Sequence, residues 1–200
     1  MGRVQQERLI IAGFGGQGIM FMGKLLCCAG MLEGRHVTYM PSYGAEVRGG
    51  TAYCNVIVSD EEIPSPVVAE PTAAIIMNTP SLIKFEPMLA KKGLIIINSA
   101  LVDRPAKRRD VEPIHIPATN IADRLGNTRV ANMVALGAFL AKRDVVQMQT
   151  ALAAVEEMLP PYRRHLVEIN RQALGEGKSF VESRSADAIW GKITRGFGFG

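Results

Sequence analysis

The residues best suited to hold a ligand lie near the N-terminus, where glycines follow a short apolar run. Gly13, Gly15 and Gly18 form the pattern G-x-G-x-x-G between a predicted strand and a predicted helix. Glycine permits positive φ and close approach of the backbone, and free N–H groups at a helix start attract phosphate or carboxylate. Gly16 opens this loop further, and Gln17 completes it. The loop is therefore a candidate cofactor-binding or subunit-facing site.

Dinucleotide binding by the usual scheme makes a further demand that this sequence does not meet. An acidic residue is expected about 20 positions on, at the end of the second strand, to hold the ribose. The predicted second strand, His36 to Met40, ends without an acid, and the nearest one is Glu46. Two alternatives stay open for the glycine loop: it packs helix against strand and meets another subunit, or it contacts an anionic ligand or a partner's cofactor.

A second candidate loop follows, Pro41 to Gly50, too polar and glycine-rich for a regular element. The carboxyl ends of strands in an open parallel sheet meet at one crevice, so we expect both loops to share one rim. Arg48 is suited to bind a phosphate or carboxylate, or to pair with Glu46. The candidate residues of this loop are Ser42, Tyr43, Gly44, Glu46, Arg48, Gly49 and Gly50.

Other polar residues give weaker signals. Asn78 and Asn98 follow predicted strands, where each either lines the crevice or forms a turn. Asn132 lies on an apolar helix and, if buried, needs a hydrogen-bond partner in this chain or another subunit. The sequence has no G-x-S-x-G, no H-x-x-x-H and only three scattered histidines. We therefore predict no catalytic residue, metal ligand or cofactor held by this chain alone.

The elements that must position these loops indicate the fold class. Short apolar runs, including Ala73 to Met77 and Leu94 to Asn98, alternate with helical patterns. This alternation predicts an α/β fold with an open, mostly parallel, Rossmann-like sheet, helices on both faces and a helical C-terminal part. The first strand, helix and second strand are expected to form a right-handed parallel β-α-β unit.

The C-terminal part is predicted to contain four helical stretches. One opens with Asp144 and Gln147 as a capping box, and the last, Tyr162 to Leu174, ends at Gly175. After Gly177 the composition changes to Ser, Arg, Gly and isolated aromatics. We predict a domain over residues 1–178 and an extension over residues 179–200 that is either disordered or docks onto a partner.

Composition narrows the class of protein. The 200 residues carry a net charge of +4, and the densest basic run, at residues 107–109, is followed by Asp110, which argues against nucleic-acid binding. The longest apolar run, residues 133–141, is too short to span a membrane. Cys27 and Cys28 are expected in the core and Cys54 half exposed, without disulfide or cluster spacing. A soluble, cytoplasmic protein is expected.

Four segments together resemble the gamma subunit of 2-oxoacid:ferredoxin oxidoreductases, most closely the 2-oxoglutarate or 2-ketoisovalerate type. They are GFGGQGI at Gly13–Ile19, PSYGAEVRGG at Pro41–Gly50, MNTPSLIKFE at Met77–Glu86 and NTRVANMVALGAFL at Asn127–Leu140. The resemblance implies CoA-dependent oxidative decarboxylation of a 2-oxoacid to acyl-CoA and CO2, with electrons passing to ferredoxin. It also implies that the gamma chain is a non-autonomous subunit.

The resemblance further implies how the cofactors are divided. Thiamine diphosphate and Mg²⁺ are expected on alpha and beta subunits, and iron-sulfur clusters on a beta or ferredoxin-like delta subunit. Both glycine-rich loops are expected to face those partners or the path of coenzyme A, with Arg48 as the phosphate contact. Two alternatives remain: a free-standing nucleotide-binding protein, and the equivalent subunit of an indolepyruvate oxidoreductase.

Overall fold

The computed structural model describes residues 5–43 and 51–196, with side chains placed for residues 5–42 and 51–184. A six-stranded sheet in the order β2-β3-β1-β4-β5-β6 forms its centre. The strands are β1 (Gln6–Phe14), β2 (His36–Tyr43), β3 (Thr51–Ser59), β4 (Ala73–Ile76), β5 (Leu94–Asn98) and β6 (Glu112–Ile116).

The sheet is mostly parallel, as the sequence predicts. β1, β4, β5 and β6 pair in parallel, whereas β3 is antiparallel to both β1 and β2. The predicted β-α-β unit is wrong in one respect, because β3 lies between β1 and β2. The physical reason is the short connection from β2 to β3: residues 44–50 are too few for a parallel crossover, which needs a dozen or more residues.

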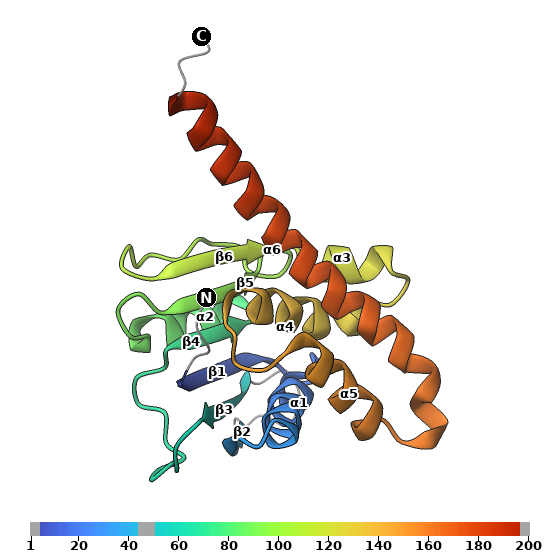
Figure 1. Ribbon diagram of the computed structural model, residues 1–200. Coiled ribbons are helices and arrows are strands. Elements are labelled where there is room, and N and C mark those ends of the chain that lie inside the picture. The colour runs from blue at the N-terminus through green and yellow to red at the C-terminus, as the bar shows by residue number, and fades with distance from the viewer. Residues whose placement is uncertain (1–4, 44–50, 197–200) are drawn as a thin grey trace.

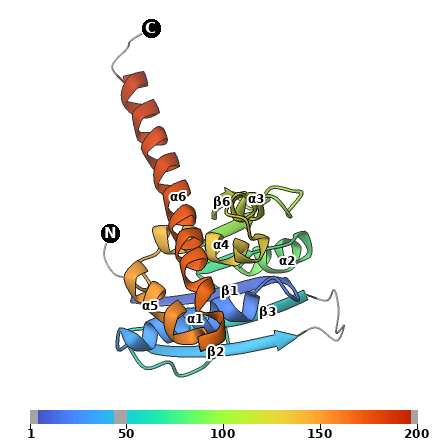
Figure 2. The same cartoon turned by 90° about the vertical axis from the view of Figure 1, so that its right-hand side faces the viewer.

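Helices cover both faces of the sheet unequally (Figures 1 and 2). The larger layer contains α1, α4, α5 and α6, while α2 lies on the other face (Figure 1). The α-helices are α1 (Ile19–Leu32), α2 (Thr79–Phe85), α3 (Ala118–Arg124), α4 (Ala131–Lys142), α5 (Met148–Met158) and α6 (Val167–Gly196). The 3-10 turns are η1 (Glu86–Met88), η2 (Thr128–Val130) and η3 (Pro161–Leu166).

Alternate side chains of the central strands enter two separate cores. On β1, Leu9 and Ile11 pack under α1 and α4, whereas Ile10 and Ala12 pack with Leu82 under α2. A strand buried on both faces has no polar alternation, which is why these strands appear in the sequence as continuous apolar runs.

Two predicted helix boundaries are wrong. α5 begins at Met148, and its preceding residue Gln147 makes no side-chain cap; instead the Gln147 N–H donates to Glu33 Oε1 at 2.7 Å. The last helix does not end at Gly175 but continues through it to Gly196. Gly177, which we interpreted as the start of a different composition, is a buried residue inside α6.

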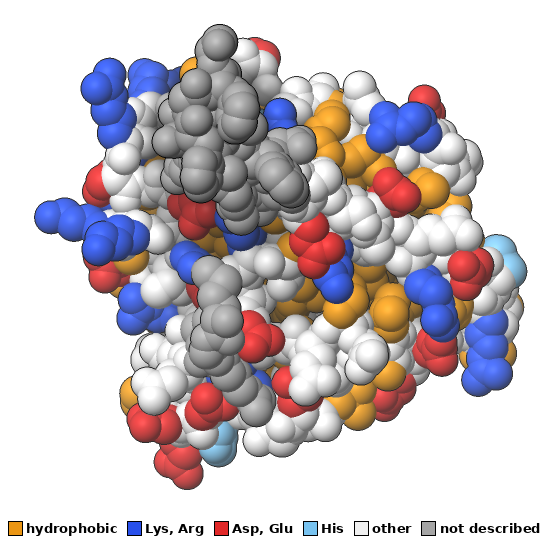
Figure 3. Space-filling view, turned by 45° about the horizontal axis from the view of Figure 1, so that its top comes forward, with side chains coloured by type: hydrophobic (Ala, Val, Ile, Leu, Met, Phe, Trp, Pro, Cys, Tyr) orange, Lys and Arg blue, Asp and Glu red, His pale blue; other side chains and the backbone are white. Residues whose placement is uncertain are grey.

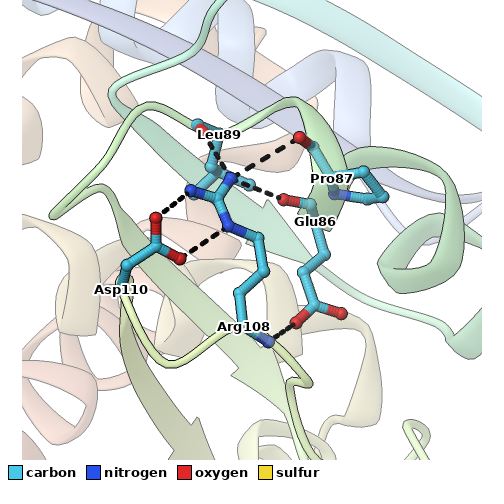
Figure 4. Close-up of polar contacts among 5 residues, drawn as sticks. All are labelled: Glu86, Pro87, Leu89, Arg108 and Asp110. Atoms are coloured by element: carbon cyan, nitrogen blue, oxygen red, sulfur yellow. Dashed lines mark hydrogen bonds and ion pairs between the residues drawn. The ribbon is translucent and has the colours of Figure 1, made fainter.

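The connection between β5 and β6 is fastened to the end of α2 by one arginine (Figure 4). The Arg108 guanidinium binds both carboxylate oxygens of Asp110, at 2.8 and 2.6 Å, and donates to the Leu89 carbonyl. The hydrogen bonds from Arg108 hold the pKa of Asp110 below its ordinary range. Buried Glu86 accepts the Arg108 N–H at 2.7 Å. Arg108 of the basic run therefore has a structural role, because it joins the β5–β6 connection to the residues that follow α2.

The amino end of the interior strand β1 contains a buried carboxylate, Glu7, whose burial predicts an effect of pH on stability. Glu7 is 2% exposed and accepts a hydrogen bond from the Thr72 hydroxyl, with Arg143 Nε 3.6 Å away. Burial raises its pKa above the ordinary 4.5, outweighing the hydroxyl and the arginine. A raised folded-state pKa means that this contribution to stability is present below the unfolded pKa and is lost as pH rises through the folded one.

We therefore expect Glu7→Gln to lose less stability than the parent chain when the pH is raised. Urea unfolding midpoints at about pH 5 and about pH 7 measure this, since both lie above the ordinary glutamate pKa. Glu62→Gln, at an exposed position after β3, is the control and should keep the parent's pH dependence. Equal pH dependence in Glu7→Gln and the parent would contradict the assignment.

Candidate functional site

The glycine-rich loop lies at the carboxyl end of β1, as predicted, and leads directly into α1. Gly13 is the last buried residue of β1, and Gly16 and Gly18 have φ of 91° and 73°. Gly18 is the N-cap of α1 and offers no side chain, so the first turn of this 14-residue helix has no side-chain cap. The N-terminus of α1 is therefore available to an acceptor from outside the loop.

Gln17 holds the loop in shape from within. Its Oε1 accepts the Phe14 N–H at 2.6 Å, and its Nε2 donates to the Met77 carbonyl at 3.3 Å. The side chain thus bridges the ends of β1 and β4, two neighbouring parallel strands whose following helices lie on opposite faces of the sheet. This is the switch point at which open α/β sheets bind ligands. Gln17 positions the loop that borders this point.

Removal of that bridge is expected to loosen the loop. Gln17→Ala leaves the Phe14 N–H and the Met77 carbonyl without their partner, and we expect a loss of about 1–3 kcal/mol in the free energy of unfolding. Gln17→Glu keeps the acceptor but loses the donor, so this variant should also have a lower free energy of unfolding than the parent. Urea unfolding measures both, and an unchanged midpoint for Gln17→Ala would show that the bridge is not needed.

Asn132, whose partner the sequence left undecided, contacts the same loop. Its Nδ2 donates to the Gly18 carbonyl at 3.5 Å, and its Oδ1 accepts the Met133 N–H at 2.9 Å. A Cβ atom at position 18 would lie 2.2 Å from Asn132 Nδ2. The start of α4 therefore rests directly on the start of α1, and only glycine fits between them.

The second candidate loop is shorter than predicted. Ser42 and Tyr43 belong to β2, paired with Tyr53 and Ala52 of β3. The residues Gly44, Glu46, Arg48, Gly49 and Gly50 lie outside the described part of the chain. The ends of their segment are described: Thr51 pairs with Phe14, and Ala52 pairs with both Tyr43 and Gly13. Residues 44–50 thus leave and rejoin the sheet at the edge that carries the glycine-rich loop.

Two cavities flank the glycine-rich loop, and Gly16 lines both. One, of about 210 Å³, is bordered by Gly16, Gln17, Met77, Leu101, Thr119 and Arg129. The other, of about 310 Å³, is mostly apolar and is bordered by Phe14, Gly15, Gly16, Met20, Phe21 and Ala52. Arg129 was not among the predicted site residues, although it belongs to the segment NTRVANMVALGAFL. Arg129 follows no predicted strand and precedes the predicted apolar helix, whereas Asn78 and Asn98 follow strands and Asn132 lies on that helix.

The two asparagines at strand ends have structural partners. Asn78 caps α2, accepting the Ser81 N–H at 2.9 Å, but its buried Nδ2 has no hydrogen-bond partner among the described residues. Asn98 Nδ2 donates to the Thr119 hydroxyl at 2.9 Å, and Thr119 borders the 210 Å³ cavity. Asn78 therefore works as a helix cap, while Asn98 holds a residue of the cavity wall.

Two of the cysteine expectations need correction. Cys54 is fully buried rather than half exposed, because β3 is an interior strand covered on the side facing α1. Cys28 is only partly buried, with its Sγ 4.0 Å from Glu157 Oε2. Cys27 is buried, as expected. Burial raises the pKa of the Cys27 and Cys54 thiols to about 12, so both remain protonated.

Within the residues the structure describes, no group of three or more His, Cys, Asp and Glu side chains is placed to hold a metal ion. None of the helices in that same part combines the length and apolar character of a membrane span. On the face shown in Figure 3, basic and acidic side chains are interspersed with apolar ones. This surface is not a basic stripe of the kind that binds nucleic acid.

The fold and the loop define a Rossmann-like α/β domain with a glycine-rich loop between two cavities at the carboxyl edge of its sheet. The chain belongs to the pyruvate ferredoxin/flavodoxin oxidoreductase family, whose model matches residues 8–180. It is similar to the 2-oxoglutarate synthase subunit KorC of Methanothermobacter thermautotrophicus, with 33% identity over 183 residues that cover 88% of this chain and 95% of KorC.

Two further comparisons agree. The ketoisovalerate oxidoreductase subunit VorA of Methanothermobacter marburgensis is 39% identical over 137 residues, covering 68% of this chain. This chain spans only 28% of the length of that relative. The solved keto/oxoacid ferredoxin oxidoreductase gamma subunit from Geobacter sulfurreducens superposes with a TM-score of 0.75 at 28% identity, covering 88% of this chain and 99% of the gamma subunit.

Proposed function

We propose that this chain is the gamma subunit of a multi-subunit 2-oxoacid:ferredoxin oxidoreductase. The complex would convert a 2-oxoacid, either 2-oxoglutarate or a branched-chain acid, and coenzyme A into acyl-CoA and CO2, passing two electrons to ferredoxin. The observation that carries the proposal is the match to KorC across 95% of that subunit's length. A free-standing nucleotide-binding protein is disfavoured by this match, because KorC is named as a subunit.

The proposal assigns the hard chemistry to cofactors on other chains. Thiamine diphosphate, Mg²⁺ and the iron-sulfur clusters are proposed to belong to alpha, beta and delta partners in the cytoplasm. When bound there, the thiamine would supply the carbanion chemistry of decarboxylation. Among the described residues of this chain, no group of three or more His, Cys, Asp and Glu side chains is placed to hold a metal ion. The proposed role of this chain is to bind the partner subunits and to orient the ligand.

Anaerobic purification of the complex through a tag on this chain tests the proposal. Coenzyme A-dependent viologen reduction should appear with one 2-oxoacid of a panel that includes 2-oxoglutarate, 2-ketoisovalerate, pyruvate and indolepyruvate. Activity with indolepyruvate alone would move the chain to that class of enzyme. A pure, inactive monomer would overturn the subunit assignment, and tight binding of NAD, FAD or coenzyme A by that monomer would favour the free-standing alternative.

We also propose that the glycine-rich loop and residues 42–50 face the partners or the path of coenzyme A. The N-terminus of α1 and the cavity of about 310 Å³ support this, because a helix N-terminus favours a phosphate and a mostly apolar cavity favours an apolar group. Arg48 stays a proposed phosphate contact. Among described residues Arg129, exposed at the rim of the 210 Å³ cavity, is the best-placed guanidinium.

Arg129→Ala is therefore expected to raise the Michaelis constant for coenzyme A by about tenfold, with little change in the constant for the 2-oxoacid. Arg124→Ala is a matched control, since Arg124 is an exposed arginine at the end of α3 that does not border the cavity. Assembly is checked by size-exclusion chromatography. Equal Michaelis constants in both variants would remove Arg129 from the proposed coenzyme A path.

A further inference from the structure

Helix α6 leaves the body of the protein before it ends. Its N-terminal half packs on α4, and its last buried residue with a described side chain is Val181. Among the described side chains of α6, Arg184 makes the last contact with the sheet, donating to the His115 carbonyl at 3.3 Å and lying over the Phe180 ring at 5.0 Å. Figures 1 and 2 both show the rest of α6 extending away from the sheet and the other helices.

The projecting part, residues 185–196, is about three helical turns, or about 18 Å, long. Because most helical stability in proteins comes from the packing of an amphipathic face rather than from propensity, a helix that extends away from the body has little stability of its own. Gly191 weakens it further. Continuing as a helix beyond the body thus favours burial against another surface.

The sequence of the projecting part has the spacing of an amphipathic helix. Ala186, Ile189 and Ile193 follow one another at i, i+3 and i+7, which places them on one face, with Trp190 beside them. Ala188 and Arg195 occupy positions on the opposite face. This pattern is that of a helix that lays one apolar stripe into a groove.

The match to the family model ends at residue 180, so the projecting part lies outside the shared domain. The VorA relative contains a long further stretch of chain beside its matching part, of which this chain spans only 28% in total. We infer that residues 185–196 of α6 dock as an amphipathic helix into an apolar groove of the partner subunit that corresponds to this further stretch. This inference rests on the proposed function.

The test uses the full chain reconstituted with purified partner subunits of its own complex. Ala186→Asp/Ile189→Asp places two charges on the apolar stripe, and Ala188→Asp is the matched control on the opposite face. We expect the double variant to bind the partner at least about tenfold more weakly, because it buries charge in an apolar interface, and the control to bind within about twofold of the parent. Thermal unfolding should show the same midpoint for the body in all three chains.

The outcomes separate this inference from the proposed function. Loss of partner binding in the double variant alone supports the inference. Parent-like binding and activity in both variants would overturn it while leaving the subunit assignment intact. A change from dimer to monomer in the double variant, with partner binding unchanged, would also overturn it, since the occupant would be a second copy. If the unsubstituted chain binds no partner subunit, both proposals fail.

Discussion

Gly177→Ala is expected to destabilise the protein by about 3 kcal/mol or more, the upper end of the cost of overpacking a core. A Cβ atom at position 177 would lie 2.0 Å from the Val134 carbonyl oxygen and 2.9 Å from the Ala138 nitrogen. The obstacle is backbone in the middle of α4, so no rotamer change relieves it. Gly137 has the reciprocal position, because a Cβ atom added there would lie 2.1 Å from the Leu174 carbonyl oxygen. Helices α4 and α6 therefore pack closely where each presents a glycine to the backbone of the other.

Gly175→Ala is the matched control, two residues away in the same helix. A Cβ atom there meets nothing within 4 Å, and the residue is exposed. Alanine is the better helix former by about 0.5–1 kcal/mol, so this variant should be more stable than the parent. Urea unfolding followed by circular dichroism measures both. If Gly177→Ala unfolded at the parent's midpoint, the close crossing of α4 and α6 would be wrong.

Gly175 and Gly177 also explain why the predicted end of the last helix is wrong. Gly175 looks like a C-cap, and a glycine near an apolar run usually is one. Whether a helix continues through glycine depends on what lies against it, and Val134 is far away in the sequence. The strands were predictable because β4 and β5 are continuous apolar runs. Their order was less so, although the length of residues 44–50 already excluded a parallel β2-β3 pair.

The candidate site likewise has features that local sequence predicts and features that depend on the packing of distant elements. The position of the glycine loop followed from the strand before it and the helix after it, and the structure has it at the end of β1. The residues that fix the shape of the loop could not be predicted from the pattern of the local sequence. Gln17 bonds to Met77 of another strand, and Arg129 reaches the crevice from a turn before α4. Such contacts depend on how distant elements pack, which spacing along one segment does not encode.

The largest effect expected at the site itself belongs to Gly18→Ala. Its φ of 73° already costs a non-glycine residue about 1 kcal/mol or more, and the new Cβ would lie 2.2 Å from Asn132 Nδ2 and 2.9 Å from its Cγ. We expect a total loss of about 2–4 kcal/mol in the free energy of unfolding. Gly15→Ala, with open space around its Cβ, should change stability by less than about 0.5 kcal/mol.

A double-mutant cycle separates strain from collision. Asn132→Ala removes the amide and leaves its Cβ 3.4 Å from a Cβ at position 18, an ordinary contact. Gly18→Ala should therefore cost less in the Asn132→Ala background, by a coupling of about 1–2 kcal/mol, while the φ strain remains. Equal costs in both backgrounds would mean that backbone conformation alone requires glycine. A positive coupling would show that the start of α4 sets the shape of the loop, because the two elements then share one contact whose removal frees the loop.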